Sequence, residues 1–247
     1  MPTSYLFQTQ YTQLDPMTWC ATANVNAALD LNVWSKAHPS LMSNKICLYP
    51  INFDSLSWQY YSSQANLSVR KNAQNQRRQQ RIGVRQLLQE LLNKLKITDT
   101  LDESQFPYRL VNNGYYVCFS HSNSNNINNK VAVVISRRHT VGIDIETNDI
   151  AWHVARRFYH FDEITALQAL PVVQRRMSIK LLWQIKESFI KISHYKLAQG
   201  LGMSYEHIIA DTIVSTEQQD LPLTITDDTE SCYRIAFLHS SQTVVIF

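Results

Sequence analysis

The segment TVGIDIET, residues 140–147, constrains the fold more than any other part of the chain. Apolar β-branched residues alternate there with a glycine and two acids, which is the pattern of a strand with one apolar and one polar face. The apolar face would present Val141, Ile143 and Ile145, and the other face Gly142, Asp144 and Glu146. Two carboxylates on one strand face are costly to bury without a positive partner. The segment therefore predicts a buried strand beside a cationic group.

Size and composition indicate a globular protein. The chain has 247 residues, of which 45% are hydrophobic and 17% charged, and this is enough for one large domain or two lobes. The formal net charge of +3 gives no reason to expect a nucleic acid or a membrane as a partner. The first residues lack the basic and apolar regions of a signal peptide, and the longest aliphatic run, residues 131–135, is too short for a bilayer. We therefore expect a cytoplasmic protein.

Cysteine and glycine usage adds two expectations. The four cysteines, Cys20, Cys47, Cys118 and Cys232, form no CxxC pair and lie in apolar or strand-like segments, which predicts reduced core thiols. Glycine occurs only five times, so each one is expected to meet a backbone need. Gly142 beside the acidic pair fits either close approach of a ligand or another strand, or a packing or bulge position.

Hydrophobic periodicity predicts the order of the elements. Strands are expected at 5–14, 45–53, 114–122, 130–136 and 141–146, and in four alternating segments of 204–247 that include HIIADTIV. Helices are expected at 18–36, 66–95, 150–158, 161–169 and 173–197. This order predicts an α+β fold with two lobes of similar plan, residues 1–139 and 140–247.

A second informative segment is LLWQIKESFIK, residues 181–191. On a helical wheel Glu187 and Lys191 lie opposite the apolar face, and alone they read as an exposed helix ion pair. Together with Asp144 and Glu146, however, Glu187 makes a set of three carboxylates without Cys or His. Such a set suits a hard divalent cation, Mg²⁺ in particular, which usually takes waters and substrate phosphates as its other ligands.

Cations that could bind phosphate are present in the first half of the chain. No acidic residue occurs between Asp54 and Glu90, whereas this window contains Arg70, Lys71, Arg77, Arg78, Arg81 and Arg85. The plain interpretation is a solvated basic helix face. The alternative is a site for a nucleotide phosphate, which guanidinium groups bind in a bidentate manner. His121 in FSHS is either structural or, when protonated, a further phosphate contact.

Taken together, these motifs resemble the 4′-phosphopantetheinyl transferases of the Sfp-like type. VGIDIE is followed by WQIKESFIK at 183–191 and preceded by FSHS at 119–122, in the order of that family. ARRF at 155–158 with Glu163, and RRQQRIGVRQLL at 77–88, extend the match. The latter segment and GYYVCFSHS look closest to the enterobactin-synthase branch.

The resemblance implies two pseudo-symmetric α+β lobes with the active site in the cleft between them. It also implies a holo-[acyl-carrier-protein] synthase activity that depends on Mg²⁺. In this reaction the 4′-phosphopantetheine arm of coenzyme A moves to a serine of an apo acyl or peptidyl carrier protein, and adenosine 3′,5′-bisphosphate is released. The implied partners are coenzyme A and the carrier, with no nucleic acid or membrane, and we expect a monomer.

Residue by residue, the resemblance gives each candidate a role. It implies that Asp144, Glu146 and Glu187 bind the metal, that Glu187 is also the general base, and that Lys191 assists catalysis at the phosphate. It implies coenzyme A contacts for Arg77 and Arg85 at the 3′-phosphate, for His121 at another phosphate, and for Lys186 in a less defined role. The chain departs from the family at 103–116, which lacks the Gly-Lys-Pro found before the histidine strand, and Arg109 is the expected substitute.

Two other functions fit part of the pattern. A Mg²⁺-dependent nucleotide phosphohydrolase also needs carboxylates and arginines, but the chain contains no GxxxxGK[ST] phosphate loop. A non-catalytic nucleic-acid-binding protein could use the basic helix at 70–85 and would show salt-sensitive affinity for DNA or RNA. That function leaves the three carboxylates unexplained.

Overall fold

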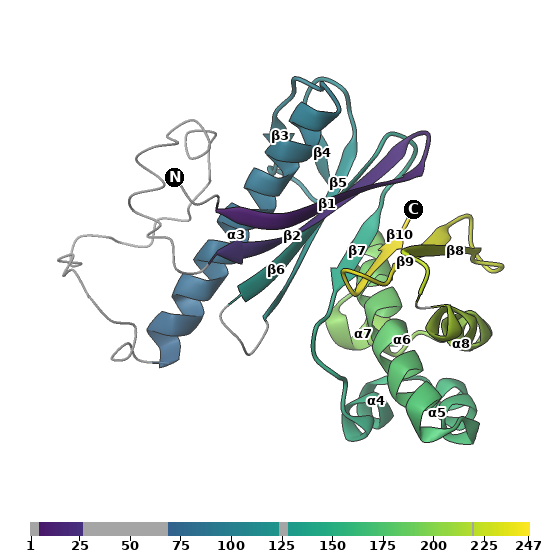
Figure 1. Ribbon diagram of the computed structural model, residues 1–247. Helices are drawn as coiled ribbons and strands as arrows, with labels where there is room; N and C mark the ends of the chain where they lie inside the picture. The colour runs from purple at the N-terminus through teal and green to yellow at the C-terminus, as the bar shows by residue number, and fades with distance from the viewer. Residues whose placement is uncertain (1–4, 27–68, 124–127, 219) are drawn as a thin grey trace.

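The computed structural model describes residues 5–26, 69–123, 128–218 and 220–247, and all structural statements below concern these residues (Figure 1). They form a mixed α+β fold with two antiparallel sheets, as expected from the sequence. The strands of the first sheet, sheet A, precede residue 137, and those of the second, sheet B, follow residue 141.

Sheet A has six strands in the order β1-β2-β6-β5-β4-β3. Their bounds are β1 Leu6–Asp15, β2 Thr18–Asn26, β3 Leu101–Asp102, β4 Tyr108–Leu110, β5 Tyr116–Asn123 and β6 Asn128–Ser136. Helix α3, Val69–Lys94, packs on one face of this sheet through an apolar stripe that includes Leu87, Leu88 and Leu91. Leucines at helical spacing are therefore the reason that α3 covers the sheet.

Sheet B has four strands in the order β7-β10-β9-β8. Their bounds are β7 Gly142–Ile145, β8 Leu223–Asp227, β9 Arg234–Leu238 and β10 Thr243–Ile246. The helices of this half are α4 Trp152–Phe158, α5 Phe161–Ala169, α6 Val172–Ser193, α7 Leu197–Leu201, the 3₁₀ turn η2 Glu206–Ile208 and α8 Ile209–Glu217. Helix α6 covers one face of sheet B with Ile185, Phe189 and Ile192.

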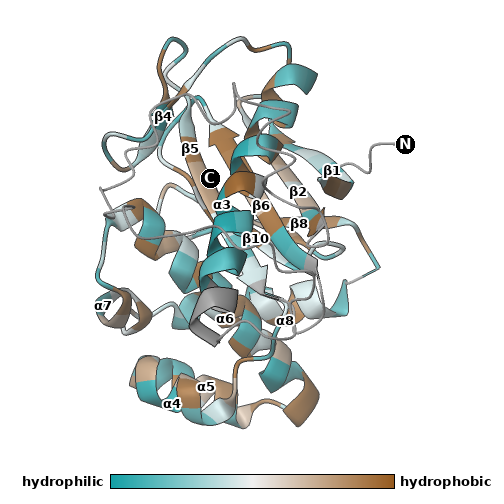
Figure 2. Cartoon of the chain, turned by 90° about the vertical axis from the view of Figure 1, so that its left-hand side faces the viewer, coloured by the Kyte–Doolittle hydropathy of each residue, from teal (hydrophilic) through white to brown (hydrophobic). Residues whose placement is uncertain are grey.

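The free faces of the two sheets pack against each other. Cys20, Cys118 and Val134 of sheet A share one apolar core with Ile143 and Val245 of sheet B. The layers therefore follow the order α3, sheet A, sheet B and α6. In Figure 2 strands β5 and β6 carry hydrophobic colour beside the mostly hydrophilic outer surface of α3. Strand β7 lies at the edge of sheet B and runs close to β5 and β6, so it is the point where the two sheets meet.

Two of the predicted elements are wrong where the structure describes them, and a third lies entirely outside the described residues. Residues 18–26 form strand β2 instead of a helix, because alternate side chains face opposite sides of the sheet: Ala21, Ala23 and Val25 enter the core under α3, and Cys20 enters the core between the sheets. The segment HIIADTIV forms η2 and α8, in which buried Ile209, Thr212 and Ser215 recur at helical spacing. Residues 27–36 and the strand expected at 45–53 lie outside the described residues.

The cysteines are partly as expected. Cys20 and Cys118 are buried free thiols in the core between the sheets. Cys232 is exposed, so the expectation of a core thiol is wrong there, and Cys47 lies outside the described residues. Among the helices that the structure describes, none combines the length and apolar character needed to cross a bilayer.

Gly142 allows β7 to approach α6 closely. A Cβ atom at this position would lie 2.2 Å from the carbonyl oxygen of Ser188 on α6. Backbone atoms cannot give way as a side chain can, so the strand or the helix would have to move. Of the alternatives raised by the sequence, close packing of another element is the one that the structure supports.

Replacing Gly142 with alanine should therefore destabilise the protein. We expect Gly142→Ala to lower the free energy of unfolding by about 1–3 kcal/mol, as overpacking usually does, in urea titrations. Gly202→Ala is the matched control, because a Cβ there would have its nearest neighbour at an ordinary 3.4 Å. Equal stability of the two variants would contradict this account of the β7–α6 contact.

Candidate active site

The two acids of the TVGIDIET segment lie at the open edge of sheet B. Strand β10 pairs with one side of β7, and the other side of β7 faces β5 of sheet A. Asp144 is buried in the strand, and Glu146 follows its last residue in a half-buried position. The edge of β7 therefore needs partners both for its backbone and for its carboxylates.

Ser120 and Ser122 of β5 supply these partners. The Oγ of Ser120 accepts a hydrogen bond from the backbone N–H of Ile145 at 3.2 Å and donates to Oδ1 of Asp144 at 2.9 Å. The Oγ of Ser122 accepts from the backbone N–H of Thr147 at 3.2 Å and donates to Oε1 of Glu146 at 3.2 Å. Each serine thus joins the two sheets and fixes one carboxylate oxygen.

In the prediction from the sequence these serines appear only as part of FSHS, and His121 alone has a role. Strand alternation could have found them, since residues 120 and 122 share one face of β5 while residue 121 lies on the other. Their spacing of two residues equals the spacing of Asp144 and Glu146 on β7. Two neighbouring strands that carry polar residues at the same spacing can pair each serine with one acid.

Lys191 of α6 is the positive partner that the acidic strand requires. Its Nζ lies 3.0 Å from Oδ1 of Asp144 and donates to the carbonyl oxygen of Ile143 at 2.6 Å. Burial disfavours the ammonium charge, but the Asp144 carboxylate more than compensates, and the pKa of Lys191 lies above its ordinary value. The plain interpretation paired Lys191 with Glu187 on the helix surface. In the structure Lys191 is instead hydrogen-bonded to β7.

Glu187 lies on the same side of α6 and is electrostatically linked to the acidic strand. Burial and the nearby charges of Asp144 and Glu146 raise its pKa, and a hydrogen bond with Trp183 and the charge of Lys191 offset only part of this effect. The strand and the helix therefore place Lys191 in contact with Asp144, and Glu187 within electrostatic range of Asp144 and Glu146. The mutual repulsion of the carboxylates is a cost that a bound cation would remove.

The donor set is suitable for a hard cation. One oxygen of Asp144 and one of Glu146 are held by hydrogen bonds, whereas no described residue donates to Oδ2 of Asp144 or Oε2 of Glu146. Within the described ranges, however, no three His, Cys, Asp or Glu side chains already surround one point at ligand distances. The carboxylate ligands are thus of the type that Mg²⁺ prefers. In this structure Asp144 is paired with Lys191.

The predicted phosphate-binding residues divide into two groups. His121 lies on the face of β5 that is directed toward α3, and desolvation together with the charges of Lys191 and Arg81 lowers its pKa. Arg77 and Arg81 are exposed on α3. Arg81, which the sequence analysis gave no individual role, is thus the arginine whose charge reaches His121. Its position four residues from both Arg77 and Arg85 was the available signal.

Arg85 is already paired. Its Nε donates to Oε2 of Glu103 at 3.1 Å, and its Nη2 contacts the other carboxylate oxygen of Glu103. A phosphate would have to compete with this carboxylate. Arg109, the expected substitute for the missing lysine, stacks on Tyr116 and donates to its hydroxyl at 2.9 Å. Its strand partner Tyr116 packs toward sheet B, so Arg109 lies on the face away from His121.

The coenzyme A contact predicted for Lys186 is not supported by its position. Its side chain is completely buried and forms an ion pair with buried Glu163 at 2.8 Å. Its amino group also donates to the carbonyl oxygens of Leu201, at 2.9 Å, and Met203. The carboxylate of Glu163 in turn accepts from the backbone N–H groups of His160 and Tyr205. This pair joins α5, α6 and the segment after α7, so Lys186 is a structural residue.

Comparison with known families agrees with this geometry for the second half of the chain. Residues 140–244 match the model of the 4′-phosphopantetheinyl transferase superfamily. The matched segment contains β7 and α6 and therefore all three carboxylates and Lys191, whereas the two serines and α3 lie before it. The match supports phosphopantetheine transfer in general, with coenzyme A and a carrier protein as the substrates of that superfamily. A search of curated proteins finds no significant match.

The buried pair gives a test that separates structure from ligand binding. Lys186→Met leaves the Glu163 carboxylate buried without its cation, so we expect a loss of about 3–5 kcal/mol in the free energy of unfolding. The double variant Lys186→Met/Glu163→Gln should recover part of this loss, because no uncompensated charge remains. Below its unfolding transition, Lys186→Met should bind coenzyme A with unchanged Kd in calorimetry. A large rise in that Kd without a loss of stability would restore the predicted ligand contact.

Proposed function

We propose that the protein transfers the 4′-phosphopantetheine arm of coenzyme A to a serine of an apo acyl or peptidyl carrier protein and releases adenosine 3′,5′-bisphosphate. We also propose that it is of the Sfp-like type and depends on Mg²⁺. The observation that supports this most directly is the joining of Asp144, Glu187 and Lys191 by β7 and α6, inside the segment that matches the superfamily.

The metal would be held by Asp144, Glu146 and Glu187. The oxygens of Asp144 and Glu146 that are free of described donors fit this role, and burial together with the charges of Asp144 and Glu146 raises the pKa of Glu187, a cost that a cation would offset. When bound, Mg²⁺ would neutralise charge on the pyrophosphate of coenzyme A. Ser120 and Ser122 would position the ligands by holding the other oxygen of each strand carboxylate.

Glu187 would also accept the proton of the attacking serine. Burial and the charges of Asp144 and Glu146 raise the pKa of Glu187, but a bound Mg²⁺ would lower it again. The role as base therefore depends on where this carboxylate lies, beside the acidic strand, and not on its pKa. The hydrogen bond from Trp183 would orient the carboxylate. The serine oxygen could then attack the phosphorus atom that bears the pantetheine arm, and the bond to the adenosine-bearing phosphate would break.

Lys191 would stabilise the charge that develops on the departing phosphate. Its raised pKa keeps the amino group protonated, and its hydrogen bonds to Asp144 and to the Ile143 carbonyl hold it at the end of the acidic strand. His121, Arg81 and Arg77 would bind the remaining phosphates of coenzyme A on the α3 side of β5. Arg85 would join them only by leaving Glu103. The site would then lie in the cleft between lobes 1–139 and 140–247 of one monomer.

Glu187→Gln separates catalysis from stability. The variant keeps the volume of the side chain but removes the base and a metal ligand, so the rate of carrier modification should fall by about 10²–10⁴. Glu206→Gln, on an exposed glutamate of η2, is the control and should retain the wild-type rate. An intact rate in Glu187→Gln would contradict the proposed role.

The same variant should be more stable than the wild type without Mg²⁺. Because the folded-state pKa of Glu187 is raised, its ionisation opposes folding as the pH rises above the ordinary value of roughly 4.3. The melting temperature of Glu187→Gln should therefore exceed that of the wild type at pH 7, and the difference should vanish below about pH 4. A variant that melts lower at pH 7 would show that Glu187 stabilises the fold.

The Arg85–Glu103 pair makes the role of Arg85 testable. If Arg85 binds the 3′-phosphate, Arg85→Ala should weaken coenzyme A by about tenfold and leave dephospho-coenzyme A nearly unchanged, as expected for a charge-assisted bond. Glu103→Gln should strengthen coenzyme A, because the guanidinium is released from a competing carboxylate. Arg78→Ala, on the same helix, is the control. Equal losses for both ligands would leave Arg85 as a partner of Glu103 only.

A further inference from the structure

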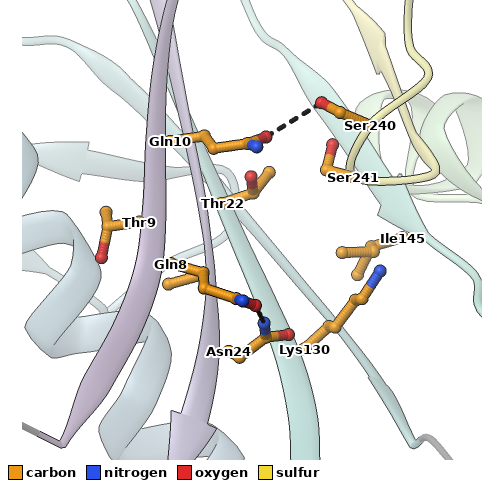
Figure 3. A pocket seen from close by; sticks show the side chains of 10 residues that line it. Gln8, Thr9, Gln10, Thr22, Asn24, Lys130, Ile145, Ser240 and Ser241 are labelled. Carbon is orange, nitrogen blue, oxygen red and sulfur yellow. Dashed lines mark hydrogen bonds between the residues drawn. The ribbon is translucent and has the colours of Figure 1, made fainter.

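A polar groove opens on the inner face of sheet A, beside the acidic centre (Figure 3). It has a volume of about 510 Å³ and lies between β1, β2 and β6 on one side and the end of β7 and the β9–β10 turn on the other. Its lining consists mainly of amides and hydroxyls, with one cation: Gln8, Gln10, Thr22, Asn24, Lys130 and Ser241. Nothing in the chemistry described above uses these residues.

The strand register connects this groove to both acidic residues. Ser122, which binds Glu146, pairs across the sheet with Lys130, and Lys130 pairs with Asn24. In the neighbouring row Ser120, which binds Asp144, pairs with Ala132, which pairs with Thr22, and Thr22 pairs with Gln10. Residues that pair across antiparallel strands point to the same face of the sheet. One polar row therefore runs from Glu146 into the groove, whereas buried Ala132 interrupts the row that starts at Asp144.

The amide side chains of the groove are oriented by hydrogen bonds, and some of their polar atoms have no partner among the described residues. Nδ2 of Asn24 donates to Oε1 of Gln8 at 2.6 Å, and Ser240 donates to Oε1 of Gln10 at 3.0 Å (Figure 3). Among the described residues no partner contacts Oδ1 of Asn24 or the Nε2 atoms of Gln8 and Gln10. The groove thus offers one acceptor group and two donor groups on side chains that these two hydrogen bonds orient.

The distribution of charge in the groove suits an extended ligand that carries little charge. Lys130 is its only cation in the described lining, and Figure 3 shows it at the end of the groove nearest Ile145. Its strand partner Ser122 binds Glu146. A ligand would therefore meet positive charge at the acidic centre and only neutral amides and hydroxyls beyond it.

We propose that this groove binds the pantetheine arm of coenzyme A during transfer, an inference that rests on the proposed function. The arm is neutral and extended, and each of its two amides presents a carbonyl acceptor and an N–H donor. It is joined to the phosphate at which the reaction occurs, so it must leave the acidic centre in some direction. The α3 side of β5 is the proposed place of the adenosine phosphates, and the polar row through Ser122, Lys130 and Asn24 leads the other way.

The test compares two ligands that differ only in the arm. Calorimetry should measure Kd for coenzyme A and for adenosine 3′-phosphate 5′-diphosphate, in which the arm is missing, both with Mg²⁺. The wild type should bind coenzyme A more tightly. Thr22→Val and Asn24→Leu should each weaken coenzyme A by about three- to tenfold, the usual effect of one lost hydrogen bond, and leave the armless ligand unchanged.

Gln13→Leu is the matched control, because Gln13 lies on β1 but on the face opposite Leu14 and the groove, and it should change neither Kd. Thermal melts would confirm folding, and near-isosteric Thr22→Val keeps the test valid if Asn24→Leu is unstable. Equal affinity of the wild type for both ligands, or equal weakening of both by Thr22→Val, would overturn the groove assignment and leave the proposed function intact. Binding of neither ligand would instead contradict the proposed function.

Discussion

The site depends on the hydroxyl groups of Ser120 and Ser122, which form hydrogen bonds along the open edge of strand β7. Strand β7 has only four residues, and one of its sides has no strand neighbour in sheet B. Ser120 and Ser122 satisfy backbone donors on that side and hold one oxygen each of Asp144 and Glu146. Packing of sheet A on sheet B sets the distance over which these bonds form. A shift of either sheet would thus disturb both the edge of β7 and the direction of its carboxylates.

Helix α6 contributes through two lysines with different environments. Lys186 and Lys191 are five residues apart, so they point to nearly opposite sides of the helix. Lys186 is buried with Glu163 and fixes the helix to α5 and to the segment after α7, whereas Lys191 reaches Asp144 at a partly open position. The buried pair gives α6 a fixed rotation, and this rotation presents Glu187 and Lys191 to the strand. One motif therefore contains both the support and the chemistry of the proposed site.

Much of this arrangement could be predicted from the sequence, because it follows from local periodicity. The alternation around Asp144 and the leucine stripe of α3 are strong patterns, and both elements are confirmed. The predictions for the segments that form β2 and α8 were wrong, because short runs of small or β-branched residues fit both the helix period and the strand period. Tertiary packing decides between the two structures. The burial of Lys186 and the pairing of Arg85 with Glu103 could not be predicted, since they depend on partners distant in the fold. Groove residues on β1 and β2 were missed because only the strand register places them in the same cross-strand rows as Ser120 and Ser122.

The most direct measurement is a combined analysis of both products. An apo carrier protein would be incubated with the protein, coenzyme A and Mg²⁺, and its intact mass would be recorded beside the amount of adenosine 3′,5′-bisphosphate. The account predicts that the carrier gains one phosphopantetheine group on serine for each nucleotide released. Release of nucleotide while the carrier stays unmodified would indicate a phosphohydrolase. An unmodified set of acyl and peptidyl carriers with coenzyme A intact would contradict the proposed transfer altogether.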